Sequence, residues 1–286
     1  MRVLYLLCGC LLWACQHRQA SREESAPLDQ KEHVEYNLNL PDNRWDLPPI
    51  LKEVSGITYW KGGLILAVQD EEGEVYVYDL NQKRVVEGVI FGRAEDYEGI
   101  AVREEECFVI NSTGELHRFS LEKGRLESQQ YILPFTRKND IEGLCLDAAK
   151  THLLILPKGA PSLEGKKGKK SVRKVYQWNI DKEVLEPEER FRIYSKRFDD
   201  LNPDADDKFA PSDLAVHPLT GDYYILAHKG KKLLVCTAEG DPKDLYLLDE
   251  ALFEQAEGIT FLPDGELLIS SEGKWGRGYI LSFKMQ

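Results

Sequence analysis

Three glutamates recur at matching places along this chain. Glu98, Glu142 and Glu257 each stand directly before a glycine and a short apolar run. Two further copies of the same pattern begin with a serine instead, at Ser55 and Ser212. Carboxylate and hydroxyl oxygens are the ligands that hard cations prefer, so these groups could hold a metal ion if the fold brings them together.

The copies must be positioned by a repeating structure. Their first residues are 43, 44, 70 and 45 positions apart, and each copy contains several strand-like runs separated by turns. A period of this size with several strands per unit is typical of a β-propeller. We therefore predict an all-β fold, a five-bladed β-propeller. The first strand of each blade would line the central channel, and the first residues of the copies would surround one mouth of that channel.

The last blade needs a strand from elsewhere in the chain. The fifth copy contains three strand-like runs, over residues 257–262, 266–271 and 279–283. Residues 33–40 alternate between polar and apolar side chains and precede the first copy. We predict that this N-terminal strand completes the last blade, because it would close the ring and remove an exposed sheet edge.

Acidic residues at the predicted mouth are the candidate metal ligands. Three carboxylates facing one narrow axis repel one another, so either their pKa values rise or a cation lies among them. The ends of the second strands reach the same rim and add further carboxylates. The candidate ligands for Ca²⁺ are Glu98, Glu142, Glu257, Asp213, Asp70 and Glu272. The alternative is that each Glu-Gly pair is a turn device whose carboxylate accepts backbone N–H groups.

The same carboxylates could also serve an enzyme. A metal-dependent hydrolase of a lactone, a phosphoester or a glycoside would use carboxylates in such a channel. The Gly-x-Ser-x-Gly motif is absent from the sequence, and no catalytic residue is assigned. We favour a binding module for an unknown small-molecule or protein ligand, and keep hydrolysis as the alternative.

The first residues resemble a lipoprotein signal. Arg2 is followed by an apolar run from Val3 to Trp13, which is too short for a permanent transmembrane helix. A small residue, Ala14, then precedes Cys15. We predict that Cys15 becomes the lipidated first residue of the mature protein, and Cys10 is a competing match.

The chain accordingly divides into three parts. We predict a lipoprotein signal peptide over residues 1–14, a flexible tether over 15–32 and the propeller domain over 33–286. The tether has almost no large apolar side chains, so it cannot offset the entropy of ordering. The protein would be a cell membrane lipoprotein that faces the periplasm or the cell exterior.

The charge of the chain limits its partners. The formal net charge is −12, which argues against nucleic acid and anionic lipid as main partners. Membrane contact would then depend on the lipid anchor, and we expect a monomer. The cysteines of the domain, Cys107, Cys145 and Cys236, lie in apolar runs and are expected to be free, buried thiols.

The longest step between copies contains two insertions. Residues 159–171 are rich in glycine and lysine, and residues 195–210 are rich in aspartate. Neither insertion carries a strand pattern, so neither hides a further blade. The lysines of 166–170 could form an anion-binding flap, but a surface loop is the simpler interpretation.

The repeats also resemble a known family. The motifs at Glu98–Ala101, Asp140–Leu144, Pro211–Pro218 and Glu257–Phe261 are similar to those of the SdiA-regulated family of bacterial envelope proteins. The resemblance covers about residues 45–286. It implies a five-bladed propeller distantly related to NHL repeats, a bound calcium ion and membrane association, and it implies no established reaction. The lysine-rich loop departs from the family pattern.

Overall fold

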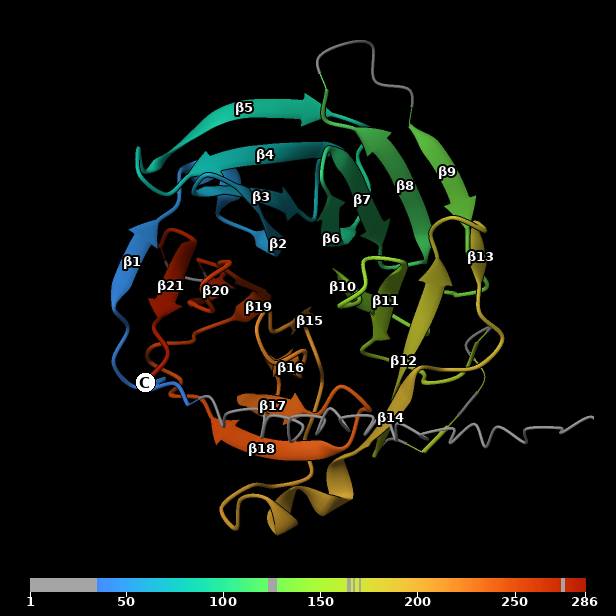
Figure 1. The fold of residues 1–286 in the computed structure, drawn as a ribbon, viewed down its shortest axis with the longest axis vertical. Helices are drawn as coiled ribbons and strands as arrows, with labels where there is room; N and C mark the ends of the chain where they lie inside the picture. The colour runs from blue at the N-terminus through green and yellow to red at the C-terminus, as the bar shows by residue number, and fades with distance from the viewer. Residues whose placement is uncertain (1–34, 123–127, 164–165, 167, 170, 274–275) are drawn as a thin grey trace, which may run out of the picture. The chain divides into compact units, whose positions relative to one another are not determined.

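Five antiparallel sheets surround a central axis in the computed structural model (Figure 1). The structure describes residues 35–122, 128–163, 166, 168–169, 171–273 and 276–286. The predicted five-bladed β-propeller is therefore confirmed. The predicted signal peptide and the whole predicted tether, with Cys15, lie outside the described residues, and the predicted domain (33–286) is described from Glu35 onward.

Four strands follow one another outward from the axis in each blade, and the third blade has one more. The innermost strands are β2 (Val54–Lys61), β6 (Tyr97–Arg103), β10 (Ile141–Leu146), β15 (Asp213–Val216) and β19 (Ala256–Phe261). The second strands are β3 (Leu64–Gln69), β7 (Glu106–Asn111), β11 (His152–Pro157), β16 (Tyr223–Ala227) and β20 (Leu267–Ser271). The third strands are β4 (Glu74–Asp79), β8 (Glu115–Ser120), β12 (Val172–Asn179), β17 (Lys232–Cys236) and β21 (Tyr279–Phe283).

The outer strands complete the sheets. They are β5 (Arg84–Ile90), β9 (Gln129–Ile132), β13 (Val184–Leu185), β18 (Pro242–Leu247) and β1 (Asn43–Asp46). In the third blade a further strand, β14 (Phe191–Tyr194), pairs with β12 beside β13. Two 3-10 helices, η1 (Pro49–Leu51) and η3 (Ser195–Asp200), lie in connections. The described part of the chain contains no helix that is long and apolar enough to cross a membrane.

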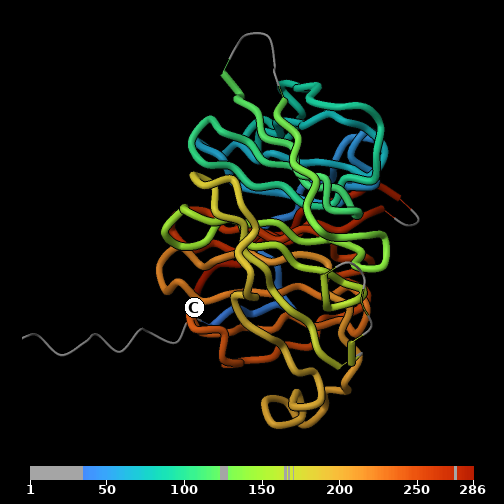
Figure 2. Tube along the Cα trace, turned by 90° about the vertical axis from the view of Figure 1, so that its right-hand side faces the viewer, coloured from blue at the N-terminus to red at the C-terminus, as the bar shows by residue number. Residues whose placement is uncertain are grey.

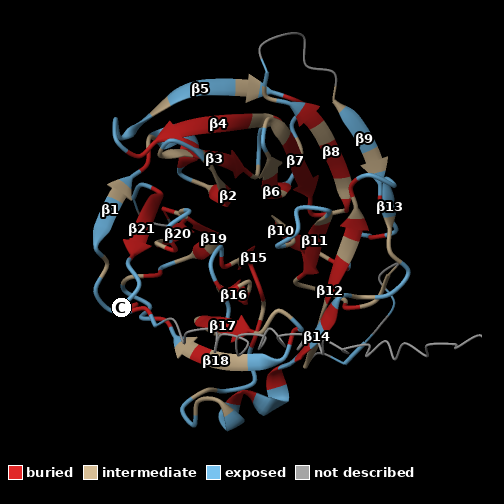
Figure 3. Cartoon of the chain, viewed as in Figure 1, coloured by how far each residue is buried: buried red, intermediate tan, exposed pale blue. Residues whose placement is uncertain are grey.

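The outer strands are the most exposed, and the inner three strands of each blade are largely buried (Figure 3). The second strands are almost continuously apolar, and every residue of β16 is buried. Such strands have a neighbouring blade on both faces, which favours apolar runs over alternation. The outer strand β5 is mostly exposed. Seen from the side, the outer parts of the blades form the wall of the ring (Figure 2). The five inner strands are therefore held from outside by a layer of fully packed second strands.

An N-terminal strand closes the last blade, as predicted, but it is Asn43–Asp46 and not the described part, residues 35–40, of the predicted segment 33–40. The strand β1 pairs antiparallel with β21, with Trp45 opposite Ile280. From the predicted segment, Tyr36 makes one isolated bridge to Met285. The closing strand therefore lies several residues later in the chain than the alternation indicated.

A turn explains the shift of the closing strand. The side chain of Asn37 accepts the N–H of Asn39, and the N–H of Leu40 donates to the Asn37 carbonyl. Pro41 follows and cannot donate to a strand ladder. Tyr36 and Leu38 are nevertheless buried in the core of the last blade. The alternating pattern therefore predicted the burial of Tyr36 and Leu38 correctly, but it was wrong about which residues pair with β21.

Candidate functional site

The first position of the repeat lies at a β-bulge in four of the five blades. Pairing between the first two strands shifts register between Tyr97 and Gly99, and the equivalent shift occurs in blades one, three and five. A bulge leaves one residue unpaired and turns its side chain away from the regular alternation. This distortion allows the first residue of a copy to point toward the mouth of the channel or toward the next blade.

The two serines fasten neighbouring blades together. The hydroxyl of Ser55 donates to the carbonyl oxygen of Tyr97 at 2.7 Å, and the hydroxyl of Ser212 donates to that of Ala256 at 2.8 Å. Both serines are buried. Each acceptor is the residue before the first position of the following blade. The serines are therefore interblade contacts, and the mouth is formed by the three glutamates.

Glu142 is paired with a lysine at this mouth. The Lys158 ammonium, just after β11, donates to the Glu142 carboxylate, which is only 4% exposed. Burial raises the pKa of Glu142, Lys158 opposes that rise, and the pKa remains at about 7. Burial alone would lower the pKa of Lys158, but Glu142, Asp140 and Glu257 hold it above its ordinary value.

The other two glutamates, Glu98 and Glu257, are half-buried, and among the described residues no ammonium group is bonded directly to either. Burial, with the nearby Glu142 carboxylate, raises the pKa of Glu98 to about 11. Burial and Glu142 also raise the pKa of Glu257 to about 8. The floor beneath them is apolar, because the third position of every copy is aliphatic and buried: Ile57, Ile100, Leu144, Leu214 and Ile259. The ionised form of these carboxylates is therefore unfavourable at this position unless a cation shares the site.

Two more predicted ligands join the same charge cluster. Burial and the nearby Asp70 and Glu53 carboxylates raise the pKa of Glu272 to about 7, and its carboxylate accepts the side-chain N–H of Gln255. Burial raises the pKa of Asp70, as do Glu53 and Asp96. One oxygen of Asp70 is buried and has no hydrogen-bond partner among the described residues. We call Glu98, Glu142, Glu257, Glu272, Asp70 and Lys158 the acidic mouth.

Asp213 lies apart from the acidic mouth. It occupies the second position of its copy, where the other four copies have glycine. Its two carboxylate oxygens accept the backbone N–H groups of Leu214 at 2.8 Å and of Ile259, in the next inner strand, at 2.9 Å. Burial raises the pKa of Asp213 well above its ordinary value, while N–H donors that include Leu144 act against that rise. Asp213 therefore fastens inner strands of three blades to one another.

The glycines at the second position of the other copies show that this position has little room for a side chain. A side chain at Gly99 would lie 2.6 Å from the Cβ of Leu144, and one at Gly56 would lie 2.6 Å from the carbonyl oxygen of Glu98. The inner strands thus approach closely at the second position. In the fourth blade, where β15 and β16 pair without a bulge, the Asp213 carboxylate fills this space with hydrogen bonds.

The sequence interpretation missed a second ring of polar residues. Two positions before the first residue of four copies stand Glu53, Asp96, Asp140 and Gln255, whereas the fourth copy has Ala210 there. The acidic members Glu53, Asp96 and Asp140 contribute to the raised pKa values described above. Residues two apart on a strand share a face, so extending the repeat upstream by two residues would have found them.

The donors of the acidic mouth suit a hard cation. Carboxylates prefer Ca²⁺ or Mg²⁺, and Ca²⁺ tolerates irregular sets of oxygens. The Asp70 oxygen without a hydrogen-bond partner is one position where a cation would supply the missing interaction. Among the described residues, however, no three His, Cys, Asp or Glu side chains are close enough to hold a metal ion together. Side chains would have to rotate toward a cation on binding.

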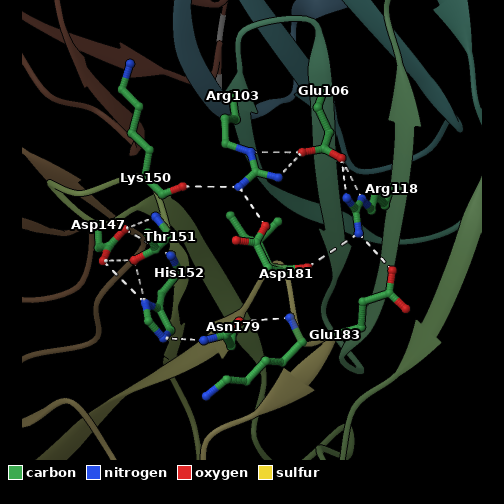
Figure 4. Close-up of polar contacts among 12 residues, drawn as sticks. Arg103, Glu106, Arg118, Asp147, Lys150, Thr151, His152, Asn179, Asp181 and Glu183 are labelled. Atoms are coloured by element: carbon green, nitrogen blue, oxygen red, sulfur yellow. Dashed lines mark hydrogen bonds and ion pairs between the residues drawn. The ribbon is translucent and has the colours of Figure 1, made fainter.

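The opposite face of the ring is charged but neutralised. At the far end of β6, Arg103 contacts Glu106 at 2.7 Å (Figure 4). Arg118 contacts Glu106 at 2.6 Å and Glu183 at 2.9 Å, and Asp181 lies 3.4 Å from Arg103. Opposite charges alternate in this network, so it carries little net charge. The imbalance of charge lies at the acidic mouth.

The stability of the domain should fall as pH rises. The pKa values of Glu142, Glu257 and Glu272 are raised from 4.5 to about 7 or 8, and that of Glu98 to about 11. A carboxyl group whose pKa is higher in the folded than in the unfolded state binds its proton more tightly in the folded state. Its contribution to stability is complete below about pH 4.5, the unfolded-state pKa, and is lost as pH rises through the folded-state pKa. We expect the melting temperature in EDTA to fall between pH 5 and pH 9, by about 2–4 °C per kcal/mol lost. A melting temperature that rises over this range would contradict the buried-carboxyl account.

Comparison with known families decides the class of the chain. Residues 30–275 match the SdiA-regulated family. The chain belongs to this family. The resemblance of the repeat motifs is thereby confirmed. No curated protein matches the sequence.

Solved structures share the fold of this SdiA-regulated propeller at low identity. The glutaminyl cyclase of Myxococcus xanthus is 14% identical with a TM-score of 0.59, and the match covers 86% of this chain and 96% of that one. A luciferin-regenerating enzyme is 11% identical with a TM-score of 0.50, over 81% of this chain and 77% of that one. A chain of the mitotic checkpoint complex is 9% identical with a TM-score of 0.50, over 97% and 98%. These likenesses concern the fold alone.

Proposed function

We propose that this SdiA-regulated protein is a membrane-anchored binding propeller whose acidic mouth holds a calcium ion and, with it, a small-molecule or protein ligand. The observation that carries the proposal is the imbalance of charge at the mouth. Four glutamates cluster there, Glu142 buried and the other three half-buried, and the Lys158 ammonium lowers the pKa of each of them. A divalent cation would replace the repulsion among these carboxylates by attraction.

The candidate calcium ligands follow from what each carboxylate already contacts. Glu142 is engaged by Lys158, and Asp213 accepts backbone N–H groups between the blades. Glu98, Glu257, Glu272 and Asp70 remain as the residues that would hold the ion. Calcium accepts six to eight oxygen ligands, so a bound ion could also accept oxygens from a ligand at the mouth.

The anchor is the second part of the proposal. The signal over residues 1–14 and the lipidated Cys15 would hold the propeller at a membrane, facing the periplasm or the cell exterior. Metabolic labelling with a fatty acid tests this directly. We expect the parent protein to carry the label and Cys15→Ala to lack it. Equal labelling of the parent protein and the variant would contradict the assignment.

Calcium should raise the melting temperature of the protein. At pH 7.5 we expect the melt in excess Ca²⁺ to exceed the melt in EDTA by several degrees, because a ligand at 100 times its Kd stabilises by about 2.7 kcal/mol. Glu257→Gln should reduce this difference, while it raises the melting temperature in EDTA by removing a repelled charge. Glu254→Gln, an exposed neighbour, is the matched control. An equal melt in Ca²⁺ and EDTA, with no metal by elemental analysis, would contradict the calcium site.

A hydrolase is the second candidate function. The observation in its favour is that Glu142 and Glu257 have pKa values of about 7 and about 8, which suit proton transfer near neutral pH. The related fold of a glutaminyl cyclase is compatible with an enzyme but does not indicate a reaction. A panel of chromogenic lactones, phosphoesters and glycosides tests this function. Activity that is lost in Glu142→Gln with the fold intact would favour the enzyme.

A further inference from the structure

A second charged site lies between the third and fourth blades. A pocket of about 730 Å³ is lined by Lys169, Arg173, Lys196, Lys208 and Lys229, together with Ser171 and Asp207. We call this site, with its five cationic side chains, the basic pocket. Five cations beside one carboxylate are unexpected in a chain of net charge −12. Repulsion among them opposes this arrangement unless an anion shares the pocket.

The two insertions build this pocket. Arg173 is the second residue of β12, just after the lysine-rich insertion. Its guanidinium donates to the carbonyl oxygens of Phe209 at 2.9 Å and Val172 at 3.1 Å. Phe209 belongs to the aspartate-rich insertion and is buried. Ala210 then bridges to Lys229 in the β16–β17 connection. Three connections are thus held together around the Arg173 guanidinium.

Asp206 lies beside the basic pocket and is shared between two lysines. Asp206 accepts a hydrogen bond from the buried Lys232 at 2.7 Å and lies 3.4 Å from Lys208. Lys196 and Lys229 have no carboxylate partner in the part of the chain that the structure describes. Both are exposed, so their ammonium groups can reach an anion over Arg173. No carboxylate of the described residues therefore pairs with these two ammonium groups, although Asp207 lines the pocket.

We propose that the basic pocket binds a phosphate group. Guanidinium and several ammonium groups suit a doubly charged, multi-oxygen anion better than a single carboxylate, and Ser171 adds a hydroxyl donor. Because β11 ends and β12 begins at the mouth end of the third blade, the basic pocket opens on the same face of the ring as the acidic mouth. The phosphate could belong to a soluble compound or to a phospholipid headgroup.

The test uses the full chain with Cys15→Ala, in EDTA so that calcium cannot bridge. The test variant is Lys196→Gln/Lys229→Gln, and the control is Lys182→Gln/Lys284→Gln, which removes two exposed lysines elsewhere. The probes are inorganic phosphate, titrated at constant ionic strength, and vesicles of phosphatidylglycerol or of phosphatidylcholine alone. We expect the test variant to weaken binding by about tenfold or more, and the control by less than about twofold.

Each outcome decides the proposal. Binding of inorganic phosphate that the test variant loses supports the pocket with a soluble ligand. Binding to phosphatidylglycerol vesicles alone, lost in the same variant, supports it with a lipid headgroup. No binding to either probe, or equal weakening in the test and control variants, would overturn it. The acidic mouth is unaffected by these substitutions, so the calcium proposal stands or fails separately.

Discussion

Replacing Asp213 by alanine is expected to lower the free energy of unfolding by about 3–5 kcal/mol. The carboxylate accepts the N–H groups of Leu214 and Ile259 where both are buried. Each buried donor left without an acceptor costs about 1–3 kcal/mol, and the lost side chain also leaves a cavity. Urea denaturation of the purified protein measures this change.

Two further variants separate the hydrogen bonds from the shape of the side chain. Asp213→Asn keeps the volume of the side chain and one acceptor oxygen, so its free energy of unfolding should fall less than that of Asp213→Ala. Asp213→Gly gives the fourth copy the residue of the other four, yet it should be at least as unstable as Asp213→Ala, because the fourth blade lacks their bulge. A loss below about 1 kcal/mol for Asp213→Ala would show that the ring does not depend on this contact.

Replacing Lys158 by methionine is expected to destabilise the protein by about 3–5 kcal/mol at pH 8. The substitution leaves Glu142 buried beside Glu98 and Glu257 without its ammonium partner, and breaking a buried pair costs this much. At pH 5 the loss should be smaller, since the Glu142 carboxyl is then protonated below its pKa of about 7. Thermal melts at both pH values measure the difference.

Calcium distinguishes two explanations of this loss. If Lys158 acts as a counter-charge, Ca²⁺ should stabilise Lys158→Met more than the parent protein, because the ion replaces the missing charge. Lys138 is an exposed lysine of the same region, so Lys138→Met is the matched control. It should change neither the stability at pH 8 nor the stabilisation by Ca²⁺. A loss of stability that is the same at pH 5 and pH 8 would indicate that Lys158 contributes through packing alone.

The fold could be predicted because its signal repeats. Five copies of one pattern fix the number of blades, and the second strands are apolar because each lies between two blades. The closing strand was misplaced because its alternation reports burial alone. Tyr36 and Leu38 are buried as expected, but the turn at Asn37 moves the pairing with β21 to Asn43–Asp46.

The acidic mouth could be predicted only in part. Glu98, Glu142 and Glu257 form one charge cluster, as their shared position in the repeat indicated. The bulges, which decide where the first position points, have no clear sequence signal. Ser55 and Asp213 look like mouth residues in the sequence, yet both bond to a neighbouring blade. These contacts join strands that are far apart in the chain, so local patterns do not report them.

Calcium titration of the purified protein tests the central claim most directly. Isothermal titration calorimetry at pH 7.5, after dialysis against EDTA and then buffer, should give one Ca²⁺ per chain. The Kd should be about 10⁻⁴ M, in the range of extracellular calcium modules. Glu98→Gln/Glu257→Gln should abolish the binding heat while the fold is retained. A parent protein that binds no Ca²⁺, or a double variant that binds it unchanged, would contradict a calcium site at the acidic mouth.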